Sequence, residues 1–425
     1  MNNQQTTLQK VEASLVRRRR KETLFRLAGI TATGVGVVFL LVFFSTLIGK
    51  GASAFQQSFL KLDIEFSADV LAPGGQLDLE YANYDSLVRA ALRDLFPDVS
   101  GRSDRRALYR LPSVAASYQV QDMIGADPDL LGTTQTLWVP ASSDVDMLLK
   151  GNIDASVEQS LRTLSDAQIG WVYSLQEAER LELRFNSALF SNGDSREPEL
   201  AGIKGAMMGS FFMLVVTIAL SFPIGVAAAI YLEEFAPRNR WSDLVEVNIN
   251  NLAAVPSIVF GLLGLAVFIN WMALPRSAPL VGGLVLTLLT LPVIIIASRA
   301  AIKAVPPSIR EAALGLGASR MQVVFHHVLP LAMPGMLTGA IIGMSRALGE
   351  SAPLLMIGMI AFIVDVPGSF TDPATALPVQ IYLWADSPER AFAERTSAAI
   401  IVLLVFLLLM NLAAVIIRKR MERKW

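Results

Sequence analysis

Residues 396–417, TSAAIIVLLVFLLLMNLAAVII, contain no charged side chain. A helix rises 1.5 Å per residue and the hydrocarbon core of a bilayer is about 30 Å thick, so a membrane-spanning helix needs about 20 apolar residues. Other charge-free windows are also long enough to span a membrane, and they comprise residues 27–49, 205–232, 247–275 and 277–298. The chain is therefore predicted to be an integral membrane protein.

A further long apolar window, residues 331–364, is interrupted by Arg346 and Glu350. We count it as a transmembrane segment, which makes about six in all. The composition agrees, because charged residues make up 17% of the chain, against about 25% in soluble domains. We predict an all-α polytopic membrane protein with an inserted α+β extracytoplasmic domain.

Basic residues next to the spans predict the orientation, because cytoplasmic flanks carry an excess of Lys and Arg. Both ends of the chain are basic, with RRRRK at 17–21 and RKRMERK at 418–424. An even number of spans puts both ends on one side, so both termini are predicted to be cytoplasmic and residues 50–204 to lie outside. Ala52-Ser53-Ala54 also fits a signal-peptidase site, and cleavage there would leave five spans with the same topology elsewhere.

The chain is predicted to have three parts. Residues 1–49 form a basic tail and the first span, residues 50–204 have the composition of a soluble domain, and residues 205–425 hold five spans with short connections. The middle part is long enough to bury its own core, and a break is expected at Gly74-Gly75. We expect strands at 62–66 and 134–139, and helices at 84–96, 157–164 and 174–189.

Composition excludes several kinds of chemistry. The chain has no cysteine, which rules out disulfides, thiolate catalysis and thiolate metal sites. Its two histidines, His326 and His327, are adjacent and too few for a histidine-rich zinc site. The net charge of −1 lacks the basic excess of nucleic-acid-binding proteins. No nucleophile with a matching base and acid stands in an external segment, so we expect no catalytic residues, no metal and no cofactor.

A basic cluster lies in the predicted outer domain, and its members are Arg102, Arg105, Arg106 and Arg110. Charge runs of this kind usually form a solvated surface. Contact with an anion or with an acidic partner is the alternative interpretation.

The loop 303–334, between the fourth and fifth spans, carries strong helix signals. Pro306-Pro307 ends the preceding helix, and Ser308 with Glu311 three residues later predicts a capping box. This first helix is expected to end at Gly315-Leu316-Gly317, because glycine can adopt the left-handed conformation that closes a helix.

A second helix is expected in the same loop. Ser319 and Gln322 predict another capping box, and Pro330 is expected to end the helix. An apolar stripe on this helix consists of Met321, Val324, Phe325 and Val328. Such an amphipathic helix–turn–helix either docks into a groove of a partner or forms a purely structural loop, and the pattern alone leaves both open.

Arg346 is the most costly residue in the window 331–364. It lies about eleven residues after Gly335, or about 16 Å along a helix, and so near the middle of the bilayer. An arginine there costs at least about 2.5–3.5 kcal/mol, so it needs a partner or a water-filled cavity. Glu350 follows four residues later on the same helix face and can pair with it. The pair either positions helices or marks an anion pathway, because a guanidinium matches phosphate oxygens.

The segment EAALGLG at 311–317, followed by VLP at 328–330, resembles the EAA loop of permease subunits in ABC importers. The positions of that motif are occupied by Glu311, Ala312, Ala313 and Gly317. His327 departs from it, because the family usually has an aliphatic residue there. The resemblance implies that the loop, from Ser308 onward, inserts into a cleft on an ATPase. This chain has no phosphate-loop motif, so ATP is expected to bind to a separate subunit.

The segment LTGAIIGMSRALGESAPLLMIG at 337–358 looks like the corresponding span of phosphate importer permeases. The shared pattern is the Arg-Ala-aliphatic-Gly-Glu core at 346–350 with Ala-Pro-Leu at 352–354, and this continuation is similar to PstA-type permeases rather than to their PstC-type partners. Ser351 stands where threonine is common and keeps the hydroxyl. The resemblance implies that Arg346, Glu350 and Ser351 lie in the substrate pathway.

The resemblance covers residues 205–425 and implies a heteromeric importer in a bacterial inner membrane. Its partners would be a second, PstC-like permease, a PstB-like ATPase dimer, a periplasmic PstS-like phosphate-binding protein and the surrounding lipid. Small residues predict close helix packing, within the chain or against the second permease, at Gly335, Gly339, Gly343 and Ala347. Residues 50–204 resemble the N-terminal extension of long PstA-type chains.

Two alternatives stay open at this point. The first is an importer for another oxyanion, such as phosphonate, sulfate or molybdate, although the Arg/Glu pair and the Ala-Pro-Leu segment favour phosphate. The second is a membrane phosphate sensor or scaffold, with residues 50–204 as its ligand-binding part. The lack of a cytoplasmic signalling domain and the intact coupling loop speak against it.

Overall fold

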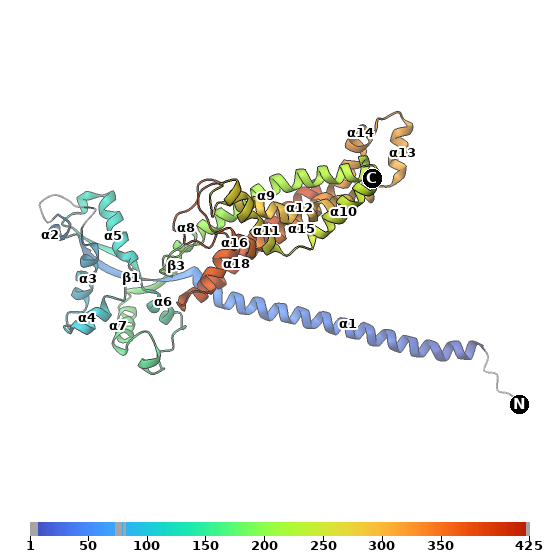
Figure 1. The fold of residues 1–425 in the computed structure, drawn as a ribbon. Helices are drawn as coiled ribbons and strands as arrows, with labels where there is room; N and C mark the ends of the chain where they lie inside the picture. The colour runs from blue at the N-terminus through green and yellow to red at the C-terminus, as the bar shows by residue number, and fades with distance from the viewer. Residues whose placement is uncertain (1–6, 73–78, 80–81, 422–425) are drawn as a thin grey trace.

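The structure is a computed structural model that describes residues 7–72, 79 and 82–421, so the break expected at Gly74-Gly75 lies outside it. Figure 1 shows a small α+β domain, a helical bundle and a long N-terminal helix that begins far from both and ends at the junction between them. This helix, α1 (Thr7–Gly51), runs for 45 residues. The rest of the chain leaves its apolar stretch uncovered, as expected for a helix that faces lipid or another subunit.

Three antiparallel strands form the sheet of the α+β domain, in the order β2-β1-β3. The central strand is β1 (Gln56–Glu65), which pairs with β2 (Thr134–Pro140) and with β3 (Leu181–Phe185). Alternate residues of β1 are fully buried, namely Leu60, Leu62 and Ile64. This period of two is that of a strand with one face on a core.

Helices pack around this sheet and complete the core of the domain (Figure 1). They are α2 (Ala68–Leu71), α3 (Tyr84–Leu95), α4 (Arg102–Leu108), α5 (Ala115–Ala126), α6 (Ser143–Leu149) and α7 (Asp166–Glu177), with 3-10 turns at Pro128–Leu130 and Gln159–Leu161. The turn Ser53–Phe55 and the helix α8 (Ala188–Ser191) belong instead to a second buried cluster, at the junction with the bundle. Leu87 and Leu92 of α3 lie in the same buried cluster as the side chains of β1. The predicted strands at 62–66 and 134–139 and the predicted helix at 84–96 are therefore confirmed.

Two predicted helices of this domain are wrong. Residues 157–164 form only one 3-10 turn. Residues 174–189 contain the end of α7, all of β3 and the start of α8. Glu179, with φ of 55°, interrupts the helix, and pairing with β1 then holds the following residues extended. Pairing with a strand far away in the sequence has overridden the local helical pattern.

The bundle contains four long helices, α9 (Lys204–Ile230), α12 (Pro279–Lys303), α15 (Leu329–Gly349) and α18 (Ala391–Met421). Together with α1, the described residues contain five helices that are long and apolar enough to span a membrane, and a bent pair raises this number to six. The prediction of about six transmembrane helices is confirmed.

The bent pair occupies the predicted span 247–275. It consists of α10 (Arg240–Ala253) and α11 (Ser257–Gly264), which continues as a π-helix through Leu265–Trp271. The two parts meet at an angle of 100°. Pro256 lies at the bend, where its missing N–H and fixed φ prevent one continuous helix.

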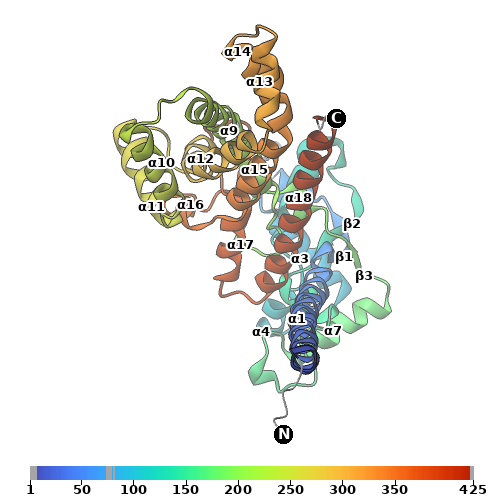
Figure 2. The same ribbon diagram turned by 90° about the vertical axis from the view of Figure 1, so that its right-hand side faces the viewer.

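Helix α12 packs against both α9 and α15 (Figure 2). The contact with α15 is close because glycine lies at the interface: a Cβ added to Gly339 would come within 2.3 Å of the Ala297 methyl, and one added to Gly335 within 2.6 Å of the Ala301 methyl. The small-residue stripe on α15 therefore packs within the chain, which is one of the two interpretations left open by the sequence.

The predicted span 331–364 is wrong at both ends. The helix begins earlier, at α14 (Arg320–Gln322), and passes through a π-helix at Val323–Val328 into α15. It ends at Gly349, and the short helices α16 (Ala352–Met356) and α17 (Leu377–Ala385) follow. Pro330 does not end the helix as expected. The wider turn of the π-helix just before it reduces the clash between the proline ring and the preceding turn.

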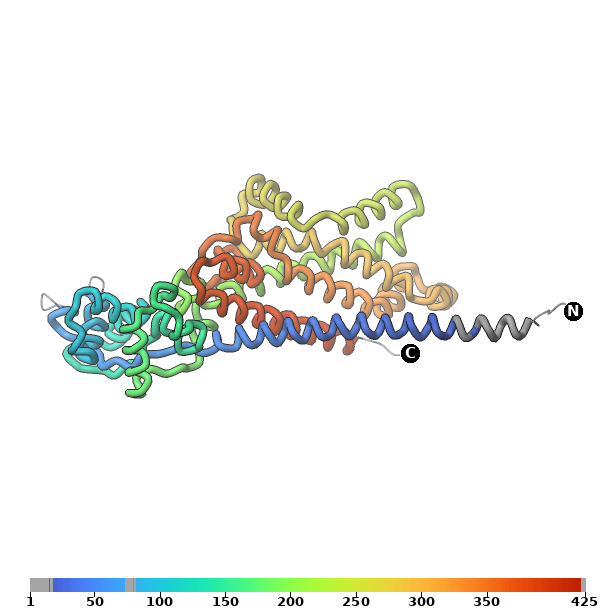
Figure 3. The backbone as a smooth tube through the Cα atoms, turned by 90° about the horizontal axis from the view of Figure 1, so that it is seen from below, coloured from blue at the N-terminus to red at the C-terminus, as the bar shows by residue number. Residues whose placement is uncertain are grey.

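The two ends of the described chain lie on the same side of the molecule. Figure 1 shows the start of α1 and the end of α18 pointing away from the α+β domain, and Figure 3 shows the same for the end of α18. The helix α13 (Pro307–Gly315) lies at this same far end of the bundle.

Candidate coupling surface and substrate pathway

Helix α13 begins one residue earlier than the sequence suggested. Pro306 is the N-cap and Pro307 the first helical residue, so Ser308 lies inside the first turn and makes no capping hydrogen bond. The predicted capping box between Ser308 and Glu311 is wrong, because the fixed φ of proline already suits the first helical position. Gly317, with φ of 87°, follows the helix in the expected left-handed conformation.

The second predicted capping box is confirmed. The backbone N–H of Ser319 donates to the side-chain oxygen of Gln322 at 2.8 Å, and the N–H of Gln322 donates to the Ser319 hydroxyl at 3.3 Å. These bonds start the helix that runs through α14 into α15. The turn between α13 and α14 is therefore held by a glycine on one side and a cap on the other.

The predicted coupling residues divide into an outer and an inner set. Four of them are exposed, namely Ser308, Glu311, Ala312 and Gly317. Ala313 is 5% exposed and packs in a cluster with Val323 and Val328, so it holds the loop together. Leu316, at the turn, is 91% exposed. Leu314, on α13, is 49% exposed, so two leucines are left uncovered at this end of the loop.

Arg310 anchors α13 to the bundle, a role that no sequence motif indicated. Its guanidinium donates to the carboxylate of Glu234 at 2.8 Å, and to the carbonyl oxygens of Val305 at 2.7 Å and Ile302 at 3.0 Å. Glu234 lies in a π-helix at the end of α9 (Tyr231–Phe235). The position of α13 therefore depends on both α9 and α12.

A second arginine ties the same region together. Arg299 of α12 donates to Glu233, next to Glu234, and to Glu246 of α10 at 2.8 Å. Lys303 lies 3.4 Å from Glu233 as well. Ion pairs thus join α10, α12 and the π-helix at the end of α9, next to the contact between Arg310 and Glu234.

The predicted pathway residues lie together at the other end of α15. The Nε atom of Arg346 is 3.5 Å from a carboxylate oxygen of Glu350, so the predicted pair forms. Glu350 is extended and follows the last helical residue, and Ser351 is the N-cap of α16. The Arg346 side chain is 44% exposed. Within this chain, the guanidinium of Arg346 therefore remains accessible to a ligand or to a neighbouring subunit.

A hydrogen bond joins the helical turn that carries Arg346 to α18. Its neighbour Ser345 donates to the side-chain oxygen of Asn411 at 2.7 Å. Asn411 lies inside the charge-free window 396–417 of α18. Arg346 is close to the end of its own helix, yet it stands level with the apolar part of the neighbouring helix.

One uninterrupted helical segment connects the two sites. It runs from Arg320, next to the capping box of the loop, to Gly349, beside Glu350. Its 30 residues, at 1.5 Å each, span about 45 Å. A displacement at the α13 end can therefore be passed directly to Arg346.

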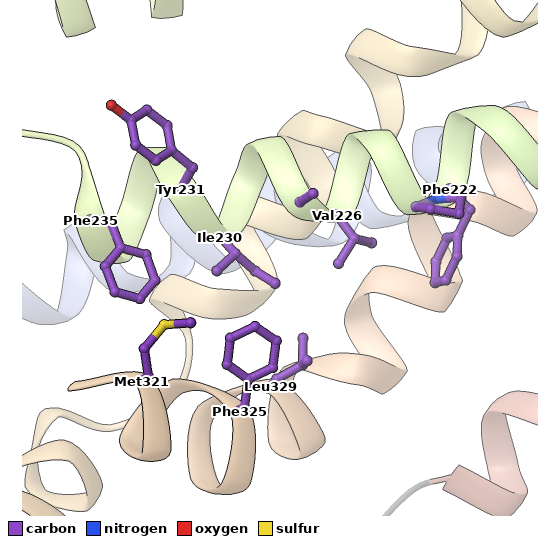
Figure 4. Close-up of a pocket in the computed structure, with 10 residues that line it drawn as sticks. Phe222, Val226, Ile230, Tyr231, Phe235, Met321, Phe325 and Leu329 are labelled. Atoms are coloured by element: carbon purple, nitrogen blue, oxygen red, sulfur yellow. The ribbon is translucent and has the colours of Figure 1, made fainter. Parts of the chain in front are cut away.

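An apolar cavity of about 670 Å³ lies between α9 and the α14–α15 segment. Figure 4 shows Phe222 and Ile230 of α9 facing Phe325 and Leu329 across it. No charged side chain lines this cavity. It offers nothing to an anion, so it is separate from the candidate pathway.

Buried ion pairs join the α+β domain to α18. Lys150, at the end of α6, lies 2.6 Å from Asp146 and 2.9 Å from Glu394, and its side chain is 4% exposed. Asp146 also accepts hydrogen bonds from the backbone N–H and the hydroxyl of Ser58 on β1. Arg395, beside Glu394, donates to the carbonyl oxygen of Ala201. The domain is thus held firmly on the first turn of the last span.

Comparison with known proteins places both sites in a family. Residues 221–424 match the family described as binding-protein-dependent transport system inner membrane component, and residues 12–159 match a domain of unknown function, DUF3333. In solved structures, the chain resembles the MetNI methionine ABC transporter in an inward-facing conformation, with a TM-score of 0.41, 20% identity, and coverage of 52% of this chain and 95% of that one.

Curated relatives match the same half. The phosphate transport system permease protein PstA 1 of Mycobacterium tuberculosis (strain CDC 1551 / Oshkosh) is 32% identical, over 51% of this chain and 70% of its own length. PstA of Haemophilus influenzae is 30% identical, over 47% and 70%. The probable ABC transporter permease YqgI of Bacillus subtilis is 37% identical, over 36% of this chain and about half (52%) of its own length. The chain therefore belongs to the family of binding-protein-dependent transport system inner membrane components, together with the PstA permeases that it matches.

Proposed function

We propose that this chain is a permease subunit of an ATP-driven phosphate importer and forms half of its transmembrane pathway. The names of the PstA relatives support the substrate class. One observation carries the proposal: the helical segment Arg320–Gly349 connects two features. The exposed loop with α13 lies at one end of the segment, and the Arg346–Glu350 pair lies at the other. In a transporter, one end of such a segment would contact the ATPase and the other end would contact the substrate.

Arg346 is the proposed contact for phosphate. Arginine stays charged and presents a planar set of donors that fits two phosphate oxygens at once. Glu350 holds the guanidinium and offsets its charge, which keeps the anion from binding too tightly to leave. Ser351 adds a hydroxyl beside them. The open side of Arg346 would face a pathway shared with a second, PstC-like permease.

Helix α13 is the proposed docking element for the ATPase. Ser308, Glu311 and Ala312 are exposed on it, and Gly317 is exposed just after it. ATP would be hydrolysed by a separate, PstB-like dimer. Closure of that dimer would pull on α13, and the ion pairs of Arg310 and Arg299 would pass the pull to the bundle.

The proposed orientation places both termini and α13 in the cytoplasm and residues 50–204 in the periplasm. The basic residues at 17–21 and 418–424 support this. The location of α13 at the end of the bundle opposite the α+β domain agrees with it. A periplasmic phosphate-binding protein would then deliver the anion on the side of the α+β domain, and α1 would contact lipid or a neighbouring subunit.

The test is phosphate uptake by Arg346→Gln in vesicles that contain the complete transporter, with its binding protein and ATPase. We expect uptake of labelled phosphate to be abolished while the ATPase still co-purifies. Arg276→Gln, which changes an exposed arginine in the connection between the π-helix Leu265–Trp271 and α12, is the matched control and should transport normally. Full transport by Arg346→Gln would remove Arg346 from the pathway.

The same vesicles test the choice of anion. Unlabelled phosphate should compete with labelled phosphate, whereas sulfate, molybdate and phosphonates should compete weakly. Stronger competition by one of these anions would assign the importer to that anion instead.

A further inference from the structure

Three of the four arginines of the basic cluster in the α+β domain line a surface pocket. Arg102 and Arg106 lie on α4, and Arg110 follows just after it, so the three recur at intervals of four residues. They line an open pocket of about 620 Å³ together with Ser103, Ala107 and Gln168. Because residues four apart share one face of a helix, Arg102 and Arg106 stand side by side on α4, and Arg110 lies beyond its last turn.

The cavity has a fixed wall. Leu108 of α4 is fully buried in the domain core, which turns the arginine face outward. Gln168, in the first turn of α7, is 6% exposed and donates to the carbonyl oxygen of Ala107. Gln168 also belongs to the capping box of α7 with Ser165. Helix α4 is thus held against α7 by a buried amide.

These arginines carry uncompensated charge. None of the three forms an ion pair within the part of the chain that the structure describes. Other arginines of the same domain do, as Arg89 with Asp85 and Arg180 with Asp63 show. Like charges four residues apart on a helix destabilise it. A group of this kind is therefore favourable when an anion lies between the guanidinium groups.

Size and spacing indicate the kind of anion. Cavities of about 300–1,000 Å³ take small organic molecules, and this one is much larger than a single phosphate group needs. Arg102 and Arg106, four residues apart on α4, are about 6 Å apart along its axis. Each guanidinium can bind a phosphate through two parallel hydrogen bonds.

The geometry points to a second anion site on this chain, for a compound with two or more linked phosphate groups. The site is distinct from Arg346, lies in the α+β domain and does not depend on the transport proposal. Ser103 supplies an additional hydroxyl at its edge. The concave shape favours a small polyanion over the surface of an acidic protein.

The experiment is calorimetric titration of the full-length chain in detergent with phosphate, pyrophosphate and tripolyphosphate, and with sulfate as a further anion. We expect affinity to rise from phosphate to tripolyphosphate. Arg106→Gln should weaken tripolyphosphate binding by about tenfold or more, because it removes the central fork. The combined change Arg102→Gln, Arg106→Gln and Arg110→Gln should abolish it.

Arg105→Gln is the matched control, because it removes the same charge from the same helix. The Arg105 side chain donates to the carbonyl oxygen of Val99 and does not line the cavity. The affinity of Arg105→Gln for tripolyphosphate should stay within about twofold of that of the unchanged chain, because the lost charge lies outside the pocket and is screened by salt. The thermal midpoint of each variant verifies that the domain is folded.

The outcomes separate this site from the transport pathway. Arg346→Gln should bind tripolyphosphate normally even when uptake is lost. Equal loss with Arg105→Gln and Arg106→Gln would overturn the proposal in favour of a diffuse charge effect. Binding of an acidic protein without binding of any of these phosphates would overturn it in favour of a docking surface.

Discussion

The guanidinium of Arg310 lies 2.8 Å from the carboxylate of Glu234, and this contact joins α13 to the end of α9. The same guanidinium also caps the carbonyl oxygens at the end of α12. Both side chains are mostly shielded from solvent, at 24% and 13% exposure. The polar attachment to the bundle of the loop that is proposed to meet the ATPase is therefore concentrated in Arg310, beside the apolar packing of Ala313.

Arg310→Met should uncouple the two halves of the transport cycle. The variant loses hydrogen bonds to a charged partner, each worth about 1.5–3 kcal/mol, and α13 can then move without α9. We expect ATP hydrolysis in reconstituted vesicles to continue while phosphate uptake per ATP falls several-fold. Arg238→Met, at an exposed arginine outside this network, should leave the ratio unchanged. An unchanged ratio in Arg310→Met would show that α13 is held by other contacts.

Glu311→Lys tests the outer face of α13. Glu311 is exposed, so the change should leave the thermal midpoint of the isolated chain unaltered. It reverses a charge at the proposed ATPase contact, and we expect hydrolysis to become uncoupled from uptake. Glu311→Gln, which only removes the charge, should have the smaller effect. If the coupling ratio in vesicles is the same for all three chains, Glu311 does not take part in docking.

Lys150→Met should strongly destabilise the junction between the α+β domain and α18. Removing one partner of a buried ion pair typically costs about 3–5 kcal/mol, because the remaining charges are left unpaired. The double variant Lys150→Met and Glu394→Gln should recover part of the loss. Thermal unfolding in detergent measures this, with exposed Lys204→Met as the control. A double variant as unstable as Lys150→Met would mean that Lys150 acts through packing rather than charge.

Local patterns predicted much of this architecture. Charge-free windows located α1, α9, α12 and α18, because the cost of burying charge in lipid keeps a spanning helix free of charged residues along its whole length. Alternation predicted the strand at 62–66, and the Ser319–Gln322 pair predicted a cap that is present. The Arg346–Glu350 pair followed from a spacing of four residues.

The wrong or missing predictions concern segments whose structure depends on residues far away in the sequence. Residues 181–185 read as helix but form a strand because β1 pairs with them. Pro330 was expected to end a helix, yet the helix continues through it because a π-helix precedes it. The bond between Arg310 and Glu234 joins residues 76 positions apart, so no local pattern could show it. The same holds for Lys150 and Glu394, which are 244 positions apart.

Gly339→Ala should disturb the contact between α12 and α15. The added methyl group would lie 2.3 Å from that of Ala297, so the helices must separate. Overpacking of this kind costs about 1–3 kcal/mol. Gly343→Ala is the matched control on the same helix, because its nearest neighbours lie at 3.7 Å, an ordinary contact distance. Equal thermal midpoints for the two variants would contradict close packing at Gly339.

Burial raises the pKa of the Glu199 carboxyl, which lies in the segment before α9 and is 5% exposed. The unfolded chain releases this proton at the ordinary pKa near 4.5, and the folded chain holds it to higher pH. Between these two values the folded state binds more protons, so the free energy of unfolding falls as the pH rises. Glu199→Gln stays neutral, and it should be more stable than the unchanged chain at pH 8 and about equal to it near pH 4.5. Thermal midpoints across this range test the sign, with exposed Glu177→Gln as the control. A lower midpoint for Glu199→Gln at pH 8 would show that the ionised carboxylate stabilises the fold, for instance through Arg395.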